Sequence, residues 1–177
     1  MRTVLNTLIL CLAAPFAAAQ EFDDRWAVVG TFDVTVEGEA ITLYALDDLE
    51  KSRDFIDITR MNPFTVYAVS GAALGDDGQP ARPYVTVMIG PFSSSPGPEA
   101  DVEWRADGKA YFANIDSGTT GSLNDFALTD DGALSFSFSA DTLIEMKTDA
   151  DWNYVPVEGS APIAVSGRFQ GRLIEEE

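Results

Sequence analysis

The 177-residue sequence contains no histidine, and its one cysteine, Cys11, lies in an N-terminal segment that we expect to be removed. This excludes Ser-His-Asp and Cys-His nucleophiles, zinc sites built on His or Cys, and haem ligation through either residue. No glycine-rich phosphate loop is present, because the glycines stand in hairpin turns and not between a strand and a helix. We therefore expect no cofactor and no enzymatic activity.

Long hydrophobic runs are also missing. The apolar stretch at residues 4–12 follows Arg2 and precedes Ala17-Ala18-Ala19, which is typical of a secretory signal peptide cleaved after Ala19. It is shorter than the roughly 20 residues that a membrane span needs. The sequence predicts a signal peptide at residues 1–19, no membrane span, and a periplasmic or secreted single all-β domain at residues 20–177.

Basic residues are scarce, since 11 Lys and Arg stand against 29 Asp and Glu and give a formal net charge of −18. This charge repels phosphate backbones and anionic lipid heads, so nucleic acid is not an expected partner. It is compatible with high solubility, with a basic protein partner or with cation binding.

Apolar and polar residues alternate with period two along most of the chain, which predicts antiparallel strands. Acid-glycine pairs and a three-residue loop predict three hairpins in which apolar residues face each other. The turns and facing pairs are Glu37-Gly38 with Val34 opposite Ile41 and Phe32 opposite Leu43, Asp107-Gly108 with Trp104 opposite Tyr111, and Asp130-Asp131-Gly132 with Leu128 opposite Leu134 and Phe126 opposite Phe136.

Two further segments complete the expected fold. The last strand, residues 163–173, turns Gly167 and Gly171 toward the core, which suggests a bend or close packing under a large neighbour. The segment DDLEKSRDF could begin a short helix at Asp47 or Asp48. The fold class is all-β: an antiparallel β-sandwich or meander β-barrel of about 8–10 strands with at most one short helix.

Residues 114–121 read NIDSGTTG, and Ile115-Asp116-Ser117-Gly118-Thr119 resembles the active-site turn of the aspartic protease family. The resemblance implies a catalytic Asp116 supported by Ser117 and Gly118. That family needs two aspartates sharing one proton, so a single motif would require a homodimer. The same residues are typical of a polar loop between strands. We favour the loop and keep a homodimeric aspartic protease as an alternative.

The segment DADWN places Asp149, Asp151 and Asn153 at alternating positions, as in the first half of an EF-hand calcium loop. The glycine and glutamate that complete such a loop would fall at Tyr154 and Ser160, so the pattern is incomplete. We favour a solvated loop without a metal, with a Ca²⁺-stabilised structural module as the alternative.

Trp152 stands alone in this polar loop and is the candidate ligand-binding residue. The sequence as a whole favours a non-enzymatic binding or inhibitor-type module. Its partner would be a basic protein or a small apolar ligand. Salt would weaken binding of the first and hardly affect the second. The oligomeric state is open.

Overall fold

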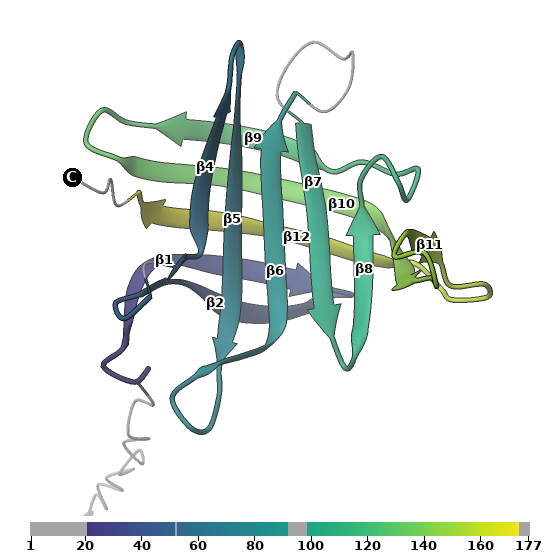
Figure 1. Ribbon diagram of the computed structural model, residues 1–177, viewed down its shortest axis with the longest axis horizontal. Coiled ribbons are helices and arrows are strands. Elements are labelled where there is room, and N and C mark those ends of the chain that lie inside the picture. Colours follow the sequence, from purple (N-terminus) through teal and green to yellow (C-terminus); the bar gives the residue numbers. More distant parts are fainter. Residues whose placement is uncertain (1–20, 52, 92–98, 174–177) are drawn as a thin grey trace, which may run out of the picture.

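The computed structural model describes residues 21–51, 53–91 and 99–173, so the expected signal peptide lies outside the described residues. Within them the protein is all-β without a helix, and 12 strands form one antiparallel sheet (Figure 1). The strands are β1 (Trp26–Val36), β2 (Glu39–Asp48), β3 (Arg53–Asp54), β4 (Ile56–Met61), β5 (Phe64–Leu74), β6 (Pro80–Gly90), β7 (Glu99–Ala106), β8 (Lys109–Ala113), β9 (Ser122–Leu128), β10 (Ala133–Thr148), β11 (Tyr154–Pro156) and β12 (Ile163–Arg172).

The sheet folds over into two layers, and the long strand β10 pairs with strands of both. Its order is β3-β2-β1-β12-β10-β8-β7-β6-β5-β4, with β9 and β11 also paired to β10 and a further bridge between β2 and β5. In Figure 1, β4 to β8 run across β1, β2, β9, β10 and β12. The 16-residue β10 pairs with β12 and β9 along its first part and with β8 near its end, and so joins the two layers.

Aromatic residues fill the space between the layers. Phe32, Phe136 and Phe169 are almost completely buried. The Phe169 ring stacks on Phe136 at a centroid distance of 5.2 Å and lies 4.7 Å from Phe32. A Cβ on Gly171 would stand 2.5 Å from Cζ of Phe169, and one on Gly167 would stand 2.9 Å from the Phe138 ring. The predicted close packing of both glycines under large neighbours is therefore confirmed.

The predicted hairpin turns are confirmed with one correction. Val34 faces Ile41, Trp104 faces Tyr111 and Leu128 faces Leu134. The expected pairing of Phe126 with Phe136 is wrong. The register of β9 against β10 shifts between Ser135 and Ser137, beside Asp125 in a left-handed conformation with φ 53°. Asp adopts this conformation more readily than most residues, and it accommodates the bulge.

The segment considered for a short helix contains none. Asp47 and Asp48 end β2, and residues 53–54 form β3. The buried Asp48 carboxylate accepts a hydrogen bond from the Glu50 backbone N–H at 3.2 Å, which forms a turn between the two strands. Nor does any part of the described chain form a helix long and apolar enough to cross a membrane.

Candidate functional site

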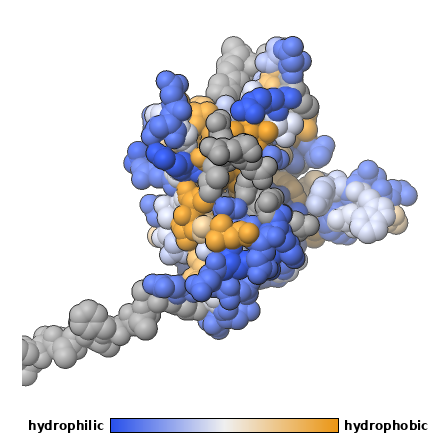
Figure 2. Space-filling model, turned by 60° about the vertical axis from the view of Figure 1, so that its left-hand side comes forward, coloured by the Kyte–Doolittle hydropathy of each residue, from blue (hydrophilic) through white to orange (hydrophobic). Residues whose placement is uncertain are grey.

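A cleft of about 480 Å³ opens between the β4–β5 pair, the β9–β10 hairpin and the end of β12. The β9–β10 turn and the end of β12, whose residues line the cleft, lie on the left-hand side of Figure 1. Figure 2 brings that side forward and shows apolar residues gathered among hydrophilic ones. The apolar residues that line the cleft are Ile58, Tyr67, Leu128 and Leu173.

The alternation of β4 places both apolar and charged residues on the cleft side. Ile56, Ile58 and Arg60 share one face of the strand, because side chains two residues apart point the same way. Ile56 is buried, Ile58 is half-buried and Arg60 is exposed. Ile58 stands opposite Tyr67 on β5, whose ring contacts Phe126 at a centroid distance of 5.4 Å. The core face of β4 therefore becomes the cleft wall toward the end of the strand.

The tip of the β9–β10 hairpin is held firmly against the end of β12. Gly132 adopts a left-handed conformation with φ 84°, and its N–H donates to the Thr129 carbonyl at 3.0 Å. The Thr129 N–H donates to the Ala133 carbonyl at 3.0 Å, and the Leu173 N–H donates to the Gly132 carbonyl at 2.9 Å. These backbone bonds fix the opposite wall of the cleft relative to β12.

Two arginines and two aspartates also line the cleft, and they differ in pairing. Arg172 Nη2 lies 2.9 Å from Asp131 Oδ2. The hydrogen bond from Thr129, together with the charge of Arg172, holds the pKa of Asp131 below its usual range. Within the described part of the chain, Arg60 and Asp130 form no ion pair. Arg60 is therefore the unpaired cation of the cleft.

The structure places Asp116 at the surface, away from this cleft. The loop is organised by Asn114 and Ser117, since the Ser117 N–H donates to Asn114 Oδ1 at 2.9 Å and the Ser117 hydroxyl donates to the Asn114 carbonyl at 2.9 Å. Gly118 takes a left-handed conformation with φ 73°, and Asp116 is exposed. The segment forms the connection between β8 and β9.

Asp101 on β7 is a carboxyl neighbour of Asp116 that the sequence did not indicate. Burial, followed by the charges of Glu99 and Asp116, raises the pKa of Asp101 to about 6. No hydrogen bond joins Asp101 to Asp116 among the described residues, whereas a protease dyad shares a proton between its carboxyls. The pairing of two Asp116 side chains across a dimer axis stays a prediction.

The DADWN loop uses its first aspartate to fix its own backbone. Asp149 Oδ1 accepts hydrogen bonds from the N–H groups of Asp151 at 2.8 Å and Asn153 at 2.9 Å. These bonds, with that of Asn153 the stronger influence, lower the pKa of Asp149. In the described residues, no group of three or more acidic side chains is placed to hold a metal ion. The calcium-stabilised module stays a prediction.

Trp152 lies at the tip of the same loop, between β10 and β11, and is 86% exposed. Its backbone is left-handed with φ 66°, a conformation that bulky residues rarely adopt. The neighbouring strand β11 lies on the right of Figure 1. Trp152 is therefore displayed to solvent.

Sequence reasoning missed the cleft residues Arg60, Leu128 and Leu173 as a group. The one available signal was the series Ile56, Ile58, Arg60, in which a charge takes the next position on a core-facing side. The hairpin tip and the end of β12 could not be brought to it without the strand order. Comparison of the chain with protein-family models, with curated proteins and with solved structures gives no match.

Proposed function

We propose that the protein is an exported binding protein that holds a small, largely apolar ligand in the cleft between β4–β5 and the β9–β10 hairpin. The observation that carries the proposal is the open cleft of about 480 Å³ with Ile58, Tyr67, Leu128 and Leu173 in its walls. Small-molecule sites commonly enclose about 300–1,000 Å³ and combine apolar walls with a few polar groups.

The physical driving force is the burial of apolar surface that now contacts water. Leu128 is 38% exposed although it faces the fully buried Leu134 across the hairpin. A ligand that covers such side chains gains roughly 25 cal/mol for each Å² of apolar area removed from water. The backbone bonds of Gly132 to Thr129 and Leu173 limit the ordering that binding would require.

The charged residues of the cleft support binding rather than catalysis. Asp131 is paired with Arg172, and its lowered pKa makes it a poor proton acceptor near neutral pH. The sequence supplies no histidine or mature-chain cysteine that could replace it. The cleft sets four apolar side chains beside a larger share of polar surface, which includes two arginines and two aspartates. A ligand bound there would meet both kinds of surface.

The test uses the uncharged fluorescent probe N-phenyl-1-naphthylamine, whose emission rises in apolar surroundings. The purified protein should enhance its emission saturably, and Leu128→Asp should weaken binding about tenfold or more, because a charge replaces part of the apolar wall. Ile115→Asp is the matched control, since Ile115 is a 73% exposed aliphatic residue outside the cleft.

Circular dichroism and melting establish that each variant is folded. Leu128→Gln gives the same comparison without a charge if the aspartate variant does not fold. Equal binding by wild type, Leu128→Asp and Ile115→Asp would refute the cleft as the binding site.

A second candidate function is binding of a cationic protein, and the exposure of Trp152 is what favours it. Trp152 projects beside the exposed Asp151 in a chain of net charge −18. Aromatic anchors surrounded by complementary charge are frequent at protein interfaces.

The probe for this candidate is polylysine. Its affinity should fall from 20 to 300 mM NaCl. Trp152→Ala should weaken it about tenfold, whereas Ala at the exposed Phe64 should not. If the two substitutions weaken polylysine binding equally, net charge alone explains the interaction.

A further inference from the structure

We infer that the ligand of the cleft is an amphiphile with an anionic head group, which pairs with Arg60 at the mouth while the apolar body lies against Ile58, Leu128 and Leu173. The inference deepens the proposed function and rests on it. It assigns the class of ligand from the order in which apolar and charged groups follow one another along the wall.

The wall that β4 forms changes from apolar to charged along the strand. Ile56 is buried, Ile58 is half-buried and Arg60 is exposed, all on one face of the strand. A ligand aligned with this strand would meet the aliphatic side chains at its inner end and the guanidinium at its outer end. That order matches an apolar chain with a head group left near water.

The two arginines of the cleft differ in whether an acidic residue pairs with them. Arg172 lies 2.9 Å from Asp131, whose carboxylate offsets its positive charge. Arg60 also lines the cleft and has no ion-pair partner in residues 21–51, 53–91 and 99–173. Arg82 and Arg168 also form no ion pair among the described residues, but they do not line the cleft.

The guanidinium group of Arg60 is suited to binding an anionic head group. Arginine presents its donors in a planar fork that matches a carboxylate or phosphate with two parallel hydrogen bonds. Asp130 is the opposing charge in the cleft, and it does not pair with Arg60. A head group carried by the ligand would supply the missing partner.

Arg60 also has a purely structural explanation. β4 lies at one end of the strand order, and inward-pointing charges on edge strands hinder unwanted pairing with other sheets. In that case Arg60 would be indifferent to the head group of a bound molecule. Ligands that share one chain and differ in head group separate the two explanations.

The experiment measures displacement of the naphthylamine probe by decanoate, decan-1-ol and decyltrimethylammonium at pH 7.5. The two ions stay below their micelle concentrations and decan-1-ol below its solubility limit. The overall charge of −18 favours the cation, whereas pairing with Arg60 favours the anion. We expect decanoate to bind about fivefold more tightly than decan-1-ol. Arg60→Gln should abolish that preference while binding of decan-1-ol is retained.

Arg168→Gln is the matched control, because Arg168 is an exposed arginine of β12 that does not line the cleft. It removes the same charge and should keep the preference for decanoate. If decan-1-ol binds as tightly as decanoate, or if both variants lose the preference equally, the anionic head group is refuted while the apolar cleft stands. If none of the three compounds displaces the probe, the proposed function falls as well.

Discussion

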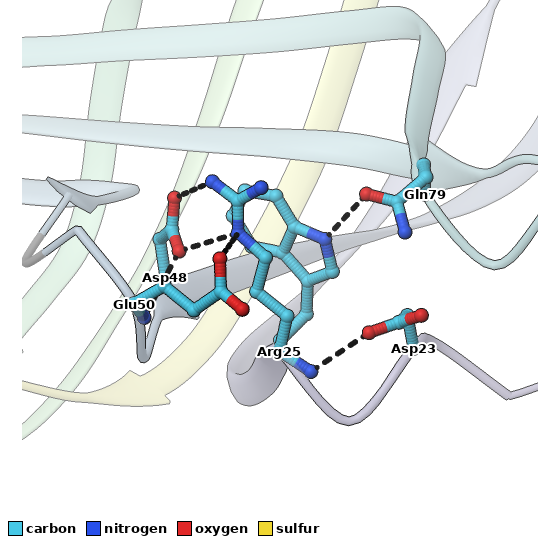
Figure 3. Close-up of polar contacts among 6 residues, drawn as sticks. Asp23, Arg25, Asp48, Glu50 and Gln79 are labelled. Atoms are coloured by element: carbon cyan, nitrogen blue, oxygen red, sulfur yellow. Dashed lines mark hydrogen bonds and ion pairs between the residues drawn. The ribbon is translucent and has the colours of Figure 1, made fainter.

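At the scale of single residues, one ion pair between a partly exposed arginine and a buried aspartate links the start of β1 to the rest of the sheet. Asp48 is the one buried charged residue in the described part of the chain. Its carboxylate accepts hydrogen bonds from Arg25 Nε at 2.7 Å and from Arg25 Nη2 (Figure 3). The Arg25 guanidinium lies over the ring of Trp26, whose Nε1 donates to Gln79 Oε1 at 3.0 Å. The cluster links β1, β2 and the β5–β6 connection.

This pair predicts a definite acid sensitivity. The hydrogen bond from Arg25 lowers the pKa of Asp48 from 3.8 to about 2. Because the folded-state pKa is below the unfolded one, the carboxylate stabilises the fold above pH 4 and loses this contribution as the pH falls toward 2. Urea unfolding should therefore show Asp48→Asn to be less stable than wild type at pH 7, with the difference shrinking between pH 4 and pH 2.

Asp47→Asn is the control for that titration, since Asp47 precedes Asp48 in β2 and is not fully buried. The free energy of unfolding of Asp47→Asn should differ little from that of wild type at pH 7. If the difference in unfolding free energy between wild type and Asp48→Asn stays constant from pH 7 to pH 2, the role given to the carboxylate is contradicted.

Turn residues could be placed from the sequence, whereas this ion pair could not. Glu37 and Gly38 both adopt positive φ, at 50° and 88°, as their identities predicted for a two-residue hairpin. Arg25 and Asp48 are 23 residues apart and meet only because β1 and β2 pair. Local turn chemistry is readable along the chain, but long-range pairing of charges depends on the fold.

At the scale of elements, β12 shows how glycine determines the approach of a strand to its neighbours. A Cβ on Gly171 would lie 2.8 Å from the Val29 carbonyl oxygen and 2.9 Å from the Gly30 Cα, as well as against the Phe169 ring. These two backbone atoms belong to β1 and cannot move away without disturbing its pairing with β12. The alternation of the strand and its inward glycines were both visible in the sequence.

We therefore expect Gly171→Ala to lower the free energy of unfolding by about 1–3 kcal/mol through overpacking. Ser166→Ala tests the same strand at an exposed position and should change the free energy of unfolding by no more than about 0.5 kcal/mol. Urea unfolding followed by circular dichroism measures both. A Gly171→Ala variant as stable as wild type would show that the neighbouring strands yield easily.

The β9–β10 hairpin marks a limit of prediction at this scale. Its three-residue turn was predicted, because Gly132 provides the left-handed residue that such loops need. The bulge beside Asp125 was not, since Asp125 carries no sequence signal as strong as glycine. The register shift falls at Phe126, whose ring contacts Tyr67 of the cleft wall.

At the scale of the whole molecule, the all-β class follows from alternation, but the cleft follows from strand order. β4 ends the order at one side, while β9 pairs only with β10 off the main path. The cleft lies between these strands and the end of β12, which come from three distant parts of the chain. No local pattern predicts such a meeting, because it depends on how the two layers cross.

Methyl NMR with decan-1-ol tests whether the cleft binds an apolar ligand. Addition of decan-1-ol should shift the methyl signals of Ile58, Leu128 and Leu173 progressively and saturably, while that of the exposed Ile115 stays in place. Shifts centred on Ile115, or no shift at any of the three cleft residues at saturating concentration, would contradict it.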